Sequence, residues 1–321
     1  MAYETGVATS QQDLLSKLGT FASGNGWTQD EFDTTNKRLS LHKGTIYVQF
    51  RWDAVDAISM YHSLGFIGTG TSPGNHTDDS GNGQTAANPL TTGRRVNRIG
   101  NGPFTAYYFF TNSSPADYIH VVLEFSPGLF RHVTFGKLVK NGTWTGGEFA
   151  GCEFIAASST GLDNTSHYVL CDGRHDQDNT LPMTIHVEGL PGQTAGTKWG
   201  IVWGPSTNLG TDRGGAARNP LIGGLRESFL QAALGWFSAN PNNGFVPMFP
   251  LQIFRRRLTS PEQWINLGTI PDLRYINIKF VNAADEFTVG GDTWKCFPWV
   301  KKTTTANADE SGNMGIAIRK T

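Results

Sequence analysis

The chain has 321 residues, with 26 Lys and Arg against 27 Asp and Glu, which gives a net charge of −1 at neutral pH. That length suits one large β domain or two modest domains, and either can bury a core without a disulfide or a metal. Nucleic-acid binding needs a basic surface and a polybasic membrane anchor needs a run of Lys and Arg, so the balanced charge argues against both. Only 17% of the residues are charged while 12% are aromatic, which indicates a turn-rich β protein or one that buries much surface in an assembly.

Signals for export and for disulfide bonding are lacking. The first ten residues have neither the basic nor the hydrophobic section of a secretory signal, and no apolar run approaches the ~18 residues that a membrane helix needs. Cys152, Cys171 and Cys296 form no C-x-x-C pair, and an odd number of cysteines argues against a disulfide framework. We therefore expect synthesis in a reducing cytoplasm and no membrane span.

The clearest helix is predicted over residues 9–22. A Thr-Ser pair can cap its start, and Leu14, Leu18 and Phe21 recur at the spacing that places them on one helix face. A short amphipathic helix is stable when that face is buried, either on its own domain or on a neighbouring subunit. The second alternative makes Leu14, Leu18 and Phe21 candidate interface residues.

Short runs of aromatic and β-branched residues, separated by turn signals, fill most of the remaining sequence. A hairpin is predicted over residues 39–50 around Gly44, and another over residues 286–297 around Gly290 and Gly291. One more helix is predicted around residues 225–237. Further strands are expected at residues 104–110, 118–125, 130–135, 198–203 and 275–280. This pattern predicts a mainly β fold with a β-sandwich or jelly-roll-like core, a short N-terminal helix and a β-rich C-terminal region.

Three regions are expected along the chain: an N-terminal helix and arm at 1–37, a β-sandwich core at 38–204 and a β-rich region at 205–321. The core region contains a long stretch at 68–102 that is rich in Gly, Asn, Ser, Thr and Asp and poor in apolar residues. Such a long loop is either a mobile surface segment or a functional arm that orders against another subunit or a ligand.

Two short strings imitate catalytic or cofactor motifs. Residues 70–74 match G-x-S-x-G, but the nucleophile elbow needs a strand before the serine and a helix after it, and Pro73 in a Gly-rich loop opposes that helix. Residues 81–86 imitate part of a dinucleotide fingerprint without the flanking strand and helix. Glu148, Glu153, Glu188 and Glu227 could serve a glycosidase, but the sequence pairs none of them. These observations favour a protein that is not an enzyme.

One dense set of potential metal ligands is present, and it comprises His167, Cys171, His175 and Asp176. All four side chains can bind zinc or a related ion, although the two-residue Cys and His spacing of common zinc sites is absent. A buried cysteine next to histidines in a solvated loop would produce the same sequence pattern without a bound metal. We therefore expect no cofactor, with one candidate structural metal site at His167, Cys171, His175 and Asp176.

Arginines at two places are further candidate contacts. Arg94, Arg95 and Arg98 end the long loop, where they could reach a partner. A second group, Arg255 to Arg257, follows an apolar run, and adjacent residues of a strand point to opposite faces. The group could protect an edge strand by its charge, or Arg255, Arg256 and Arg257 could grip carboxylates of a neighbouring subunit.

Several segments resemble structural proteins of tailed bacteriophages, particularly tail and baseplate components. They lie at both ends and in the middle of the chain, and comprise residues 3–9, 13–18, 118–122, 130–138, 144–147, 291–298 and 311–320. None of them carries a defined mechanism, so the resemblance transfers no catalytic residue. It implies a virion protein that is synthesised in the bacterial host cytoplasm.

The expected function is therefore that of a non-enzymatic structural subunit of a phage tail or baseplate, which assembles through loops and terminal arms. Its partners would be other virion proteins and further copies of itself, as a trimer or hexamer. The alternatives are a receptor-binding or glycan-binding module that contacts host surface glycan, a neck or capsid decoration protein, or a cell-envelope hydrolase.

Overall fold

A computed structural model describes residues 1–52, 58–66, 76–77, 95–98, 102–152, 180–181, 183–188, 199–203, 225–227, 246–257, 263–299, 301–302 and 314–321. These residues form one helix and 22 strands in three sheets, so the mainly β fold predicted from the sequence is confirmed. Within the same residues, no helix has the length and apolar character to cross a membrane.

The N-terminal helix α1 spans Gln11–Gly24. Its N-cap is Ser10, whose hydroxyl accepts a hydrogen bond from the backbone N–H of Asp13 at 3.1 Å. Asp13 in turn pairs with Lys17 one helical turn later, at 2.8 Å. Asn25 caps the other end through backbone bonds to the last turn. The predicted helix is thus confirmed, shifted by two residues.

The smaller of the two main sheets is six-stranded, in the order β14-β8-β5-β4-β3-β2. The hairpin predicted around Gly44 is confirmed as β3–β4 of this sheet: Lys43 pairs with Ile46 across a turn in which Gly44 has φ 58°. The bounds are β2 Thr28–Asp33, β3 Arg38–Lys43, β4 Ile46–Trp52, β5 Ile58–Ser63, β8 Arg95–Arg98 and β14 Thr180–Leu181. A separate two-stranded sheet joins β6 (Gly65–Phe66) to β7 (His76–Thr77).

The large sheet is 14-stranded and runs β1-β9-β10-β11-β13-β15-β16-β17-β18-β19-β22-β21-β20, while β12 pairs with β19. Its first half comprises β1 Ala2–Ala8, β9 Phe104–Asn112, β10 Tyr118–Ser126, β11 Leu129–Lys137, β12 Val139–Lys140, β13 Thr145–Cys152 and β15 Met183–Glu188. The second half comprises β16 Trp199–Trp203, β17 Leu225–Glu227, β18 Met248–Arg257, β19 Gln263–Asn277, β20 Glu286–Val289, β21 Asp292–Pro298 and β22 Met314–Arg319.

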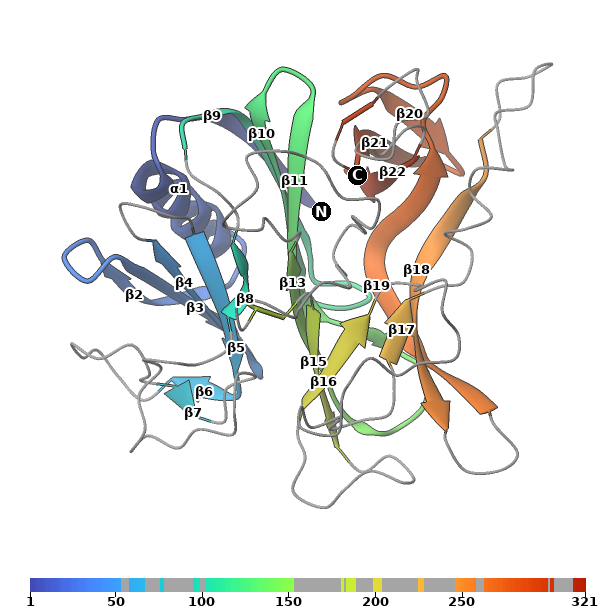
Figure 1. Ribbon diagram of the computed structural model, residues 1–321, viewed down its shortest axis with the longest axis horizontal. Coiled ribbons are helices and arrows are strands. Elements are labelled where there is room, and N and C mark those ends of the chain that lie inside the picture. The colour runs from blue at the N-terminus through green and yellow to red at the C-terminus, as the bar shows by residue number, and fades with distance from the viewer. Residues whose placement is uncertain are drawn as a thin grey trace.

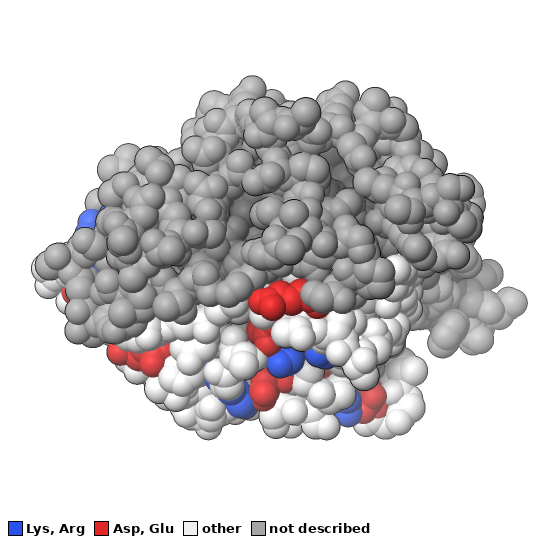
Figure 2. Space-filling model, turned by 90° about the horizontal axis from the view of Figure 1, so that it is seen from below, with Lys and Arg blue, Asp and Glu red and all other residues white. Residues whose placement is uncertain are grey.

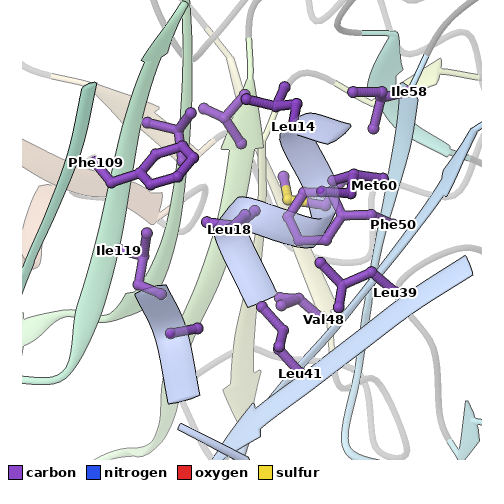
Figure 3. Packing of buried hydrophobic residues seen from close by; sticks show 14 of the residues in the cluster. Leu14, Leu18, Leu39, Leu41, Val48, Phe50, Ile58, Met60, Phe109 and Ile119 are labelled. Atoms are coloured by element: carbon purple, nitrogen blue, oxygen red, sulfur yellow. The ribbon is translucent and has the colours of Figure 1, made fainter. Parts of the chain in front are cut away.

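Three layers result (Figure 1). The first layer is α1 with the six-stranded sheet, the central layer is formed by β1, β9–β11, β13 and β15, and the third layer by β18–β22. One apolar core lies between the first and central layers, where Leu14, Leu18, Phe50, Phe109 and Ile119 meet (Figure 3). A second core lies between the central and third layers.

Strand alternation explains why the central layer has two buried faces. Along β9, Phe109 belongs to the first core and Phe110 to the second, and along β10, Val121 and Val122 divide in the same way. The side chains of these strands are therefore nearly continuously apolar or aromatic, as expected for strands that are covered on both sides.

Two sequence-based boundaries fall within continuous structure. β2 pairs with β3 across the boundary expected at residue 37. The boundary at 204 is crossed by the second core, because Phe110 and Phe149 pack in the same cluster as Leu251 and Tyr275. The two parts of the chain therefore share one apolar core.

The prediction of a helix around residues 225–237 is wrong for the first three residues, because Leu225–Glu227 form strand β17. Pairing with β16 on one side and β18 on the other overrides the local helical pattern there. Residues 228–237 lie outside the described residues. The strand expected at 275–280 ends at Asn277, and Phe280 beyond it is 68% exposed. The hairpin around Gly290 and Gly291 is confirmed, with Val289 opposite Asp292.

Candidate functional site

The apolar face of α1 packs on its own chain. Leu14, Leu18 and Phe21 are 3%, 2% and 5% exposed and belong to the first core. Phe21 contacts the ring of Phe109 in the central layer at a centroid distance of 5.4 Å. This corrects the expectation that the three residues meet a neighbouring subunit: their apolar surface is already covered by β3, β4 and β9.

The candidate arginines lie partly within described strands. Arg95 and Arg98 belong to β8, which pairs with β5, whereas Arg94 lies outside the described residues. Arg255 pairs with Leu225 on one side and Ile265 on the other, so at that position β18 is an interior strand. The alternative of an edge strand protected by charge is therefore wrong for Arg255. An interface role for these arginines stays a prediction.

The candidate metal ligands His167, Cys171, His175 and Asp176 lie outside the described residues. Among the residues that are described, no group of three or more His, Cys, Asp and Glu side chains has the arrangement of a metal site. Cys296 is a buried free thiol in β21.

Buried polar and charged side chains cluster instead at two places where neighbouring layers meet, which we call the first and the second junction. The first junction joins the six-stranded sheet to the central layer around Glu148 of β13. Oε1 of Glu148 accepts hydrogen bonds from Oγ1 of Thr45 at 2.5 Å and from Nζ of Lys137 at 3.0 Å. Oε2 lies 2.8 Å from Nδ1 of His186, whose Nε2 lies 2.9 Å from a carboxylate oxygen of Glu188.

In the first junction, Glu148 and His186 each stabilise the charged form of the other. Burial alone would raise the pKa of Glu148, but hydrogen bonds from His186, Thr45 and Lys137 outweigh it and hold that pKa far below 4.5. Burial would lower the pKa of His186, whereas hydrogen bonds to Glu148 and Glu188 raise it above 6.5. Carboxylate oxygens can only accept, so the contacts of both ring nitrogens favour the imidazolium form of His186 between the two carboxylates. His62 lies within the electrostatic reach of this pair, and burial lowers its pKa to about 3.

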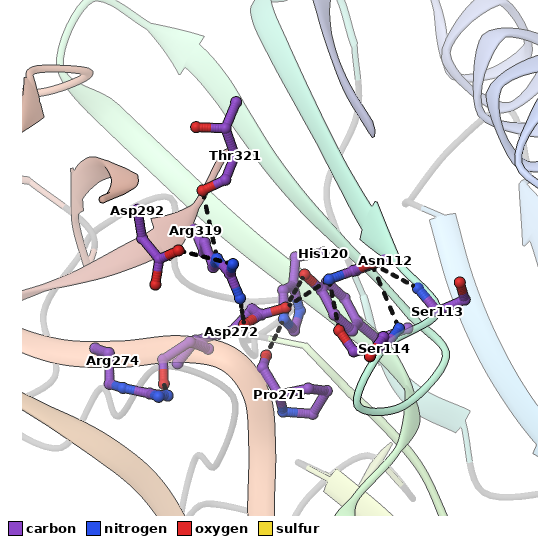
Figure 4. Close-up of polar contacts among 12 residues, drawn as sticks. Asn112, Ser113, Ser114, His120, Pro271, Asp272, Arg274, Asp292, Arg319 and Thr321 are labelled. Carbon is purple, nitrogen blue, oxygen red and sulfur yellow. Dashed lines mark hydrogen bonds and ion pairs between the residues drawn. The ribbon is translucent and has the colours of Figure 1, made fainter. Parts of the chain in front are cut away.

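The second junction joins the central layer to a bend in β19 (Figure 4). Tyr118 Oη donates to Oδ2 of Asp272 at 2.8 Å, and Asn112 Nδ2 donates to the same oxygen at 3.3 Å. Nη1 of Arg319 lies 3.4 Å from Oδ1 of Asp272, and Nη2 of Arg319 lies 2.7 Å from Oδ1 of Asp292. Asp272 has φ 52°, a left-handed conformation that this network stabilises. Burial and the neighbouring carboxylate raise the pKa of Tyr118, so its phenol stays protonated as a donor.

Two histidines complete the second junction. Nε2 of His120 lies 2.9 Å from the carbonyl oxygen of Pro271 in β19, and Nε2 of His132 lies 2.9 Å from the carbonyl oxygen of Pro298 in β21. Both rings are buried in the face of the central layer that meets the third layer.

Exposed charges are mixed in sign. On the face shown in Figure 2, acidic and basic side chains of the described residues lie side by side. Elsewhere on the molecule, Glu286 pairs with Lys295 at 2.9 Å and with Lys320 at 3.0 Å, and both ammonium groups also lie over the ring of Tyr3. This group connects β1 to the C-terminal hairpin.

Sequence reasoning named two members of the first junction without pairing them. Glu148 and Glu188 were candidate glycosidase carboxylates, and the structure places both on opposite nitrogens of one histidine. The alternation of β15 offers one signal, because His186 and Glu188 are two residues apart and share a strand face. Nothing in the sequence indicates that Tyr118 and Asp272 meet, since 154 residues separate them.

No protein-family model matches the chain, and no curated protein matches it significantly.

Proposed function

We propose that the chain is a non-enzymatic structural subunit of a phage tail or baseplate, which assembles with further copies of itself and with other virion proteins. The resemblance of its segments to tailed-phage virion proteins is what supports this class of protein. Three of these segments, residues 3–9, 118–122 and 130–138, contribute to strands β1, β10 and β11 of the central layer, in which β9 lies between β1 and β10.

The observation that carries the proposal is the exposure of apolar side chains at both ends of the large sheet. Val7 in β1 is 61% exposed and Val289 in β20 is 40% exposed. Among the described strands, β1 pairs only with β9 and β20 only with β21, so each presents a free strand edge. Free edges that carry apolar residues favour strand pairing with another chain.

The first experiment is light scattering coupled to size exclusion, on the full chain at several concentrations. A discrete trimer, hexamer or larger ring is expected. The double variant Val7→Lys with Val289→Lys should shift that equilibrium toward monomer, because charge on an edge opposes pairing. The matched control is Thr34→Lys with Thr35→Lys, which adds the same charge at an exposed turn between β2 and β3. Equal oligomerisation of both variants would contradict assembly through these edges.

The arginines keep their proposed role as contacts in the same assembly. Replacing Arg255, Arg256 and Arg257 together by Ala should impair incorporation into particles while the chain still folds. Normal incorporation would contradict that role. A chain that stays monomeric at every concentration and binds host surface polysaccharide saturably would instead favour the receptor-binding alternative.

A further inference from the structure

His120 and His132 are neighbours on one face of the central layer. His120 lies in β10 opposite Thr134, and His132 lies in β11 opposite Val122, so the two histidines occupy diagonal positions of one antiparallel pair. Their exposed fractions are 1% and 2%. Both therefore face the third layer from the middle of the second junction, and they do so independently of any role in a virion.

Each histidine bonds to the backbone of the third layer in its neutral form. A carbonyl oxygen can only accept, so the contacts with Pro271 and Pro298 require the hydrogen on Nε2 of each ring. Nδ1 of His120 then accepts from the hydroxyl of Thr134. Nδ1 of His132 is buried and has no hydrogen-bond partner among the described residues.

We propose that His120 and His132 form an acid-releasable joint, in which protonation of both rings at Nδ1 separates the β18–β22 layer from the central layer. A proton on Nδ1 of His120 makes that nitrogen a donor, so the Thr134 hydroxyl has to turn and accept from it, and it places a charge on a ring that is 1% exposed. A proton on Nδ1 of His132 places a charge in an apolar site beside the ring of Phe297, at a centroid distance of 6.5 Å. Opening the joint lets water solvate both charges.

Charged groups around the two histidines affect how readily each ring takes up a proton. From the third layer, Asp272 attracts a proton toward His120, but its carboxylate is already engaged by Tyr118, Asn112 and Arg319. Arg131 on the same strand opposes a charge on His132, and each histidine opposes a charge on the other. Arg274 of β19 lies in the same charge network as Asp272 and Arg319.

Burial dominates these effects and lowers the pKa of both rings to about 4 from 6.5. Each group therefore binds its proton more readily in the opened state, and the closed state loses stability as the pH falls from 6.5 toward 4. With these values, lowering the pH from 8 to 5 raises the opening equilibrium by about 30-fold for each histidine, or roughly 1000-fold for the pair.

The test uses the full chain, incubated between pH 8 and pH 4 and then pulse-labelled with deuterium at one fixed pH. We expect β19, β21 and β22 to lose protection between pH 6.5 and 4, before the β3–β4 hairpin of the first layer does. Wild-type protein that keeps the third layer protected at pH 4, or loses protection in all layers together, would overturn the proposal.

Substitutions assign the effect to the two rings. His120→Gln with His132→Gln keeps an N–H donor toward the carbonyl oxygens but takes up no proton, so the acid-dependent opening should be lost. His62→Gln changes a buried histidine of the first junction instead and should leave the opening of β19 and β21 unchanged. Wild-type histidine titration by NMR provides a measurement that needs no variant: the rings of His120 and His132, together with that of His62, should stay neutral at pH 5.5, and titration of His120 and His132 near 6.5 would exclude the joint.

Discussion

Nδ1 of His186 lies 2.8 Å from Oε2 of Glu148, and the two side chains are almost fully enclosed between the first and central layers. Glu148 also accepts from Thr45 in the turn of the β3–β4 hairpin, so the pair links strands β13 and β15 to the neighbouring sheet. The arrangement is cohesive, because both oxygens of the buried carboxylate are occupied by donors from three other segments.

Glu148→Gln is expected to destabilise the chain by about 3 kcal/mol, because it leaves the imidazolium of His186 and the ammonium of Lys137 without their shared buried partner. Urea unfolding followed by circular dichroism measures the loss. The matched control is Glu188→Gln, at a side chain 37% exposed, where the cost should stay below about 1 kcal/mol. Equal costs at the two positions would show that burial of the Glu148 pair is not what stabilises the junction.

The same pair predicts a loss of stability on the alkaline side. The folded-state pKa of His186 is raised above 6.5, so its contribution is fully present below pH 6.5 and is lost as the pH rises through the raised value. We expect the difference in urea midpoint between wild type and His186→Gln to be largest near pH 6 and to shrink toward pH 9. A difference that stays constant over this range would contradict a charged His186.

In the second junction, Tyr118→Phe should cost about 2 kcal/mol, because it removes one donor from the buried carboxylate of Asp272. Tyr107→Phe is the matched control: its hydroxyl donates at 2.8 Å to Glu4, a carboxylate that is only half-buried, and its loss should cost under about 1 kcal/mol. Thermal and urea unfolding of both variants provide the comparison. A Tyr118→Phe protein as stable as wild type would mean that Asn112 and Arg319 suffice to hold Asp272.

The features that could be predicted from the sequence are local ones. The helix has a capping Ser10 and apolar residues at helical spacing, and the hairpins at Gly44 and Gly290 have turns in which those glycines adopt positive φ. Both signals act within a dozen residues, so the sequence alone carries them. Strand alternation likewise indicated a layered β protein.

The junctions could not be predicted because their members are brought together by sheet topology. Glu148 meets Thr45 across 103 residues, and Tyr118 meets Asp272 across 154. No local pattern specifies that β8 joins β5 or that β15 lies beside β13. For the same reason the sequence leaves open whether the helix face packs on its own domain or on a partner subunit: its amphipathicity shows that Leu18 is buried, but not which chain buries it.

Leu18→Ala separates these two alternatives directly. Leu18 is 2% exposed within the first core, so truncation should cost about 3 kcal/mol of unfolding free energy through lost packing. Assembly of the folded fraction should be unchanged, because β3, β4 and β9 of the same chain surround the helix. Thr20→Ala on the exposed side of α1 should alter stability by less than about 0.5 kcal/mol. A Leu18→Ala protein that unfolds like wild type but dissociates at lower dilution would restore the subunit interface that the helix packing contradicts.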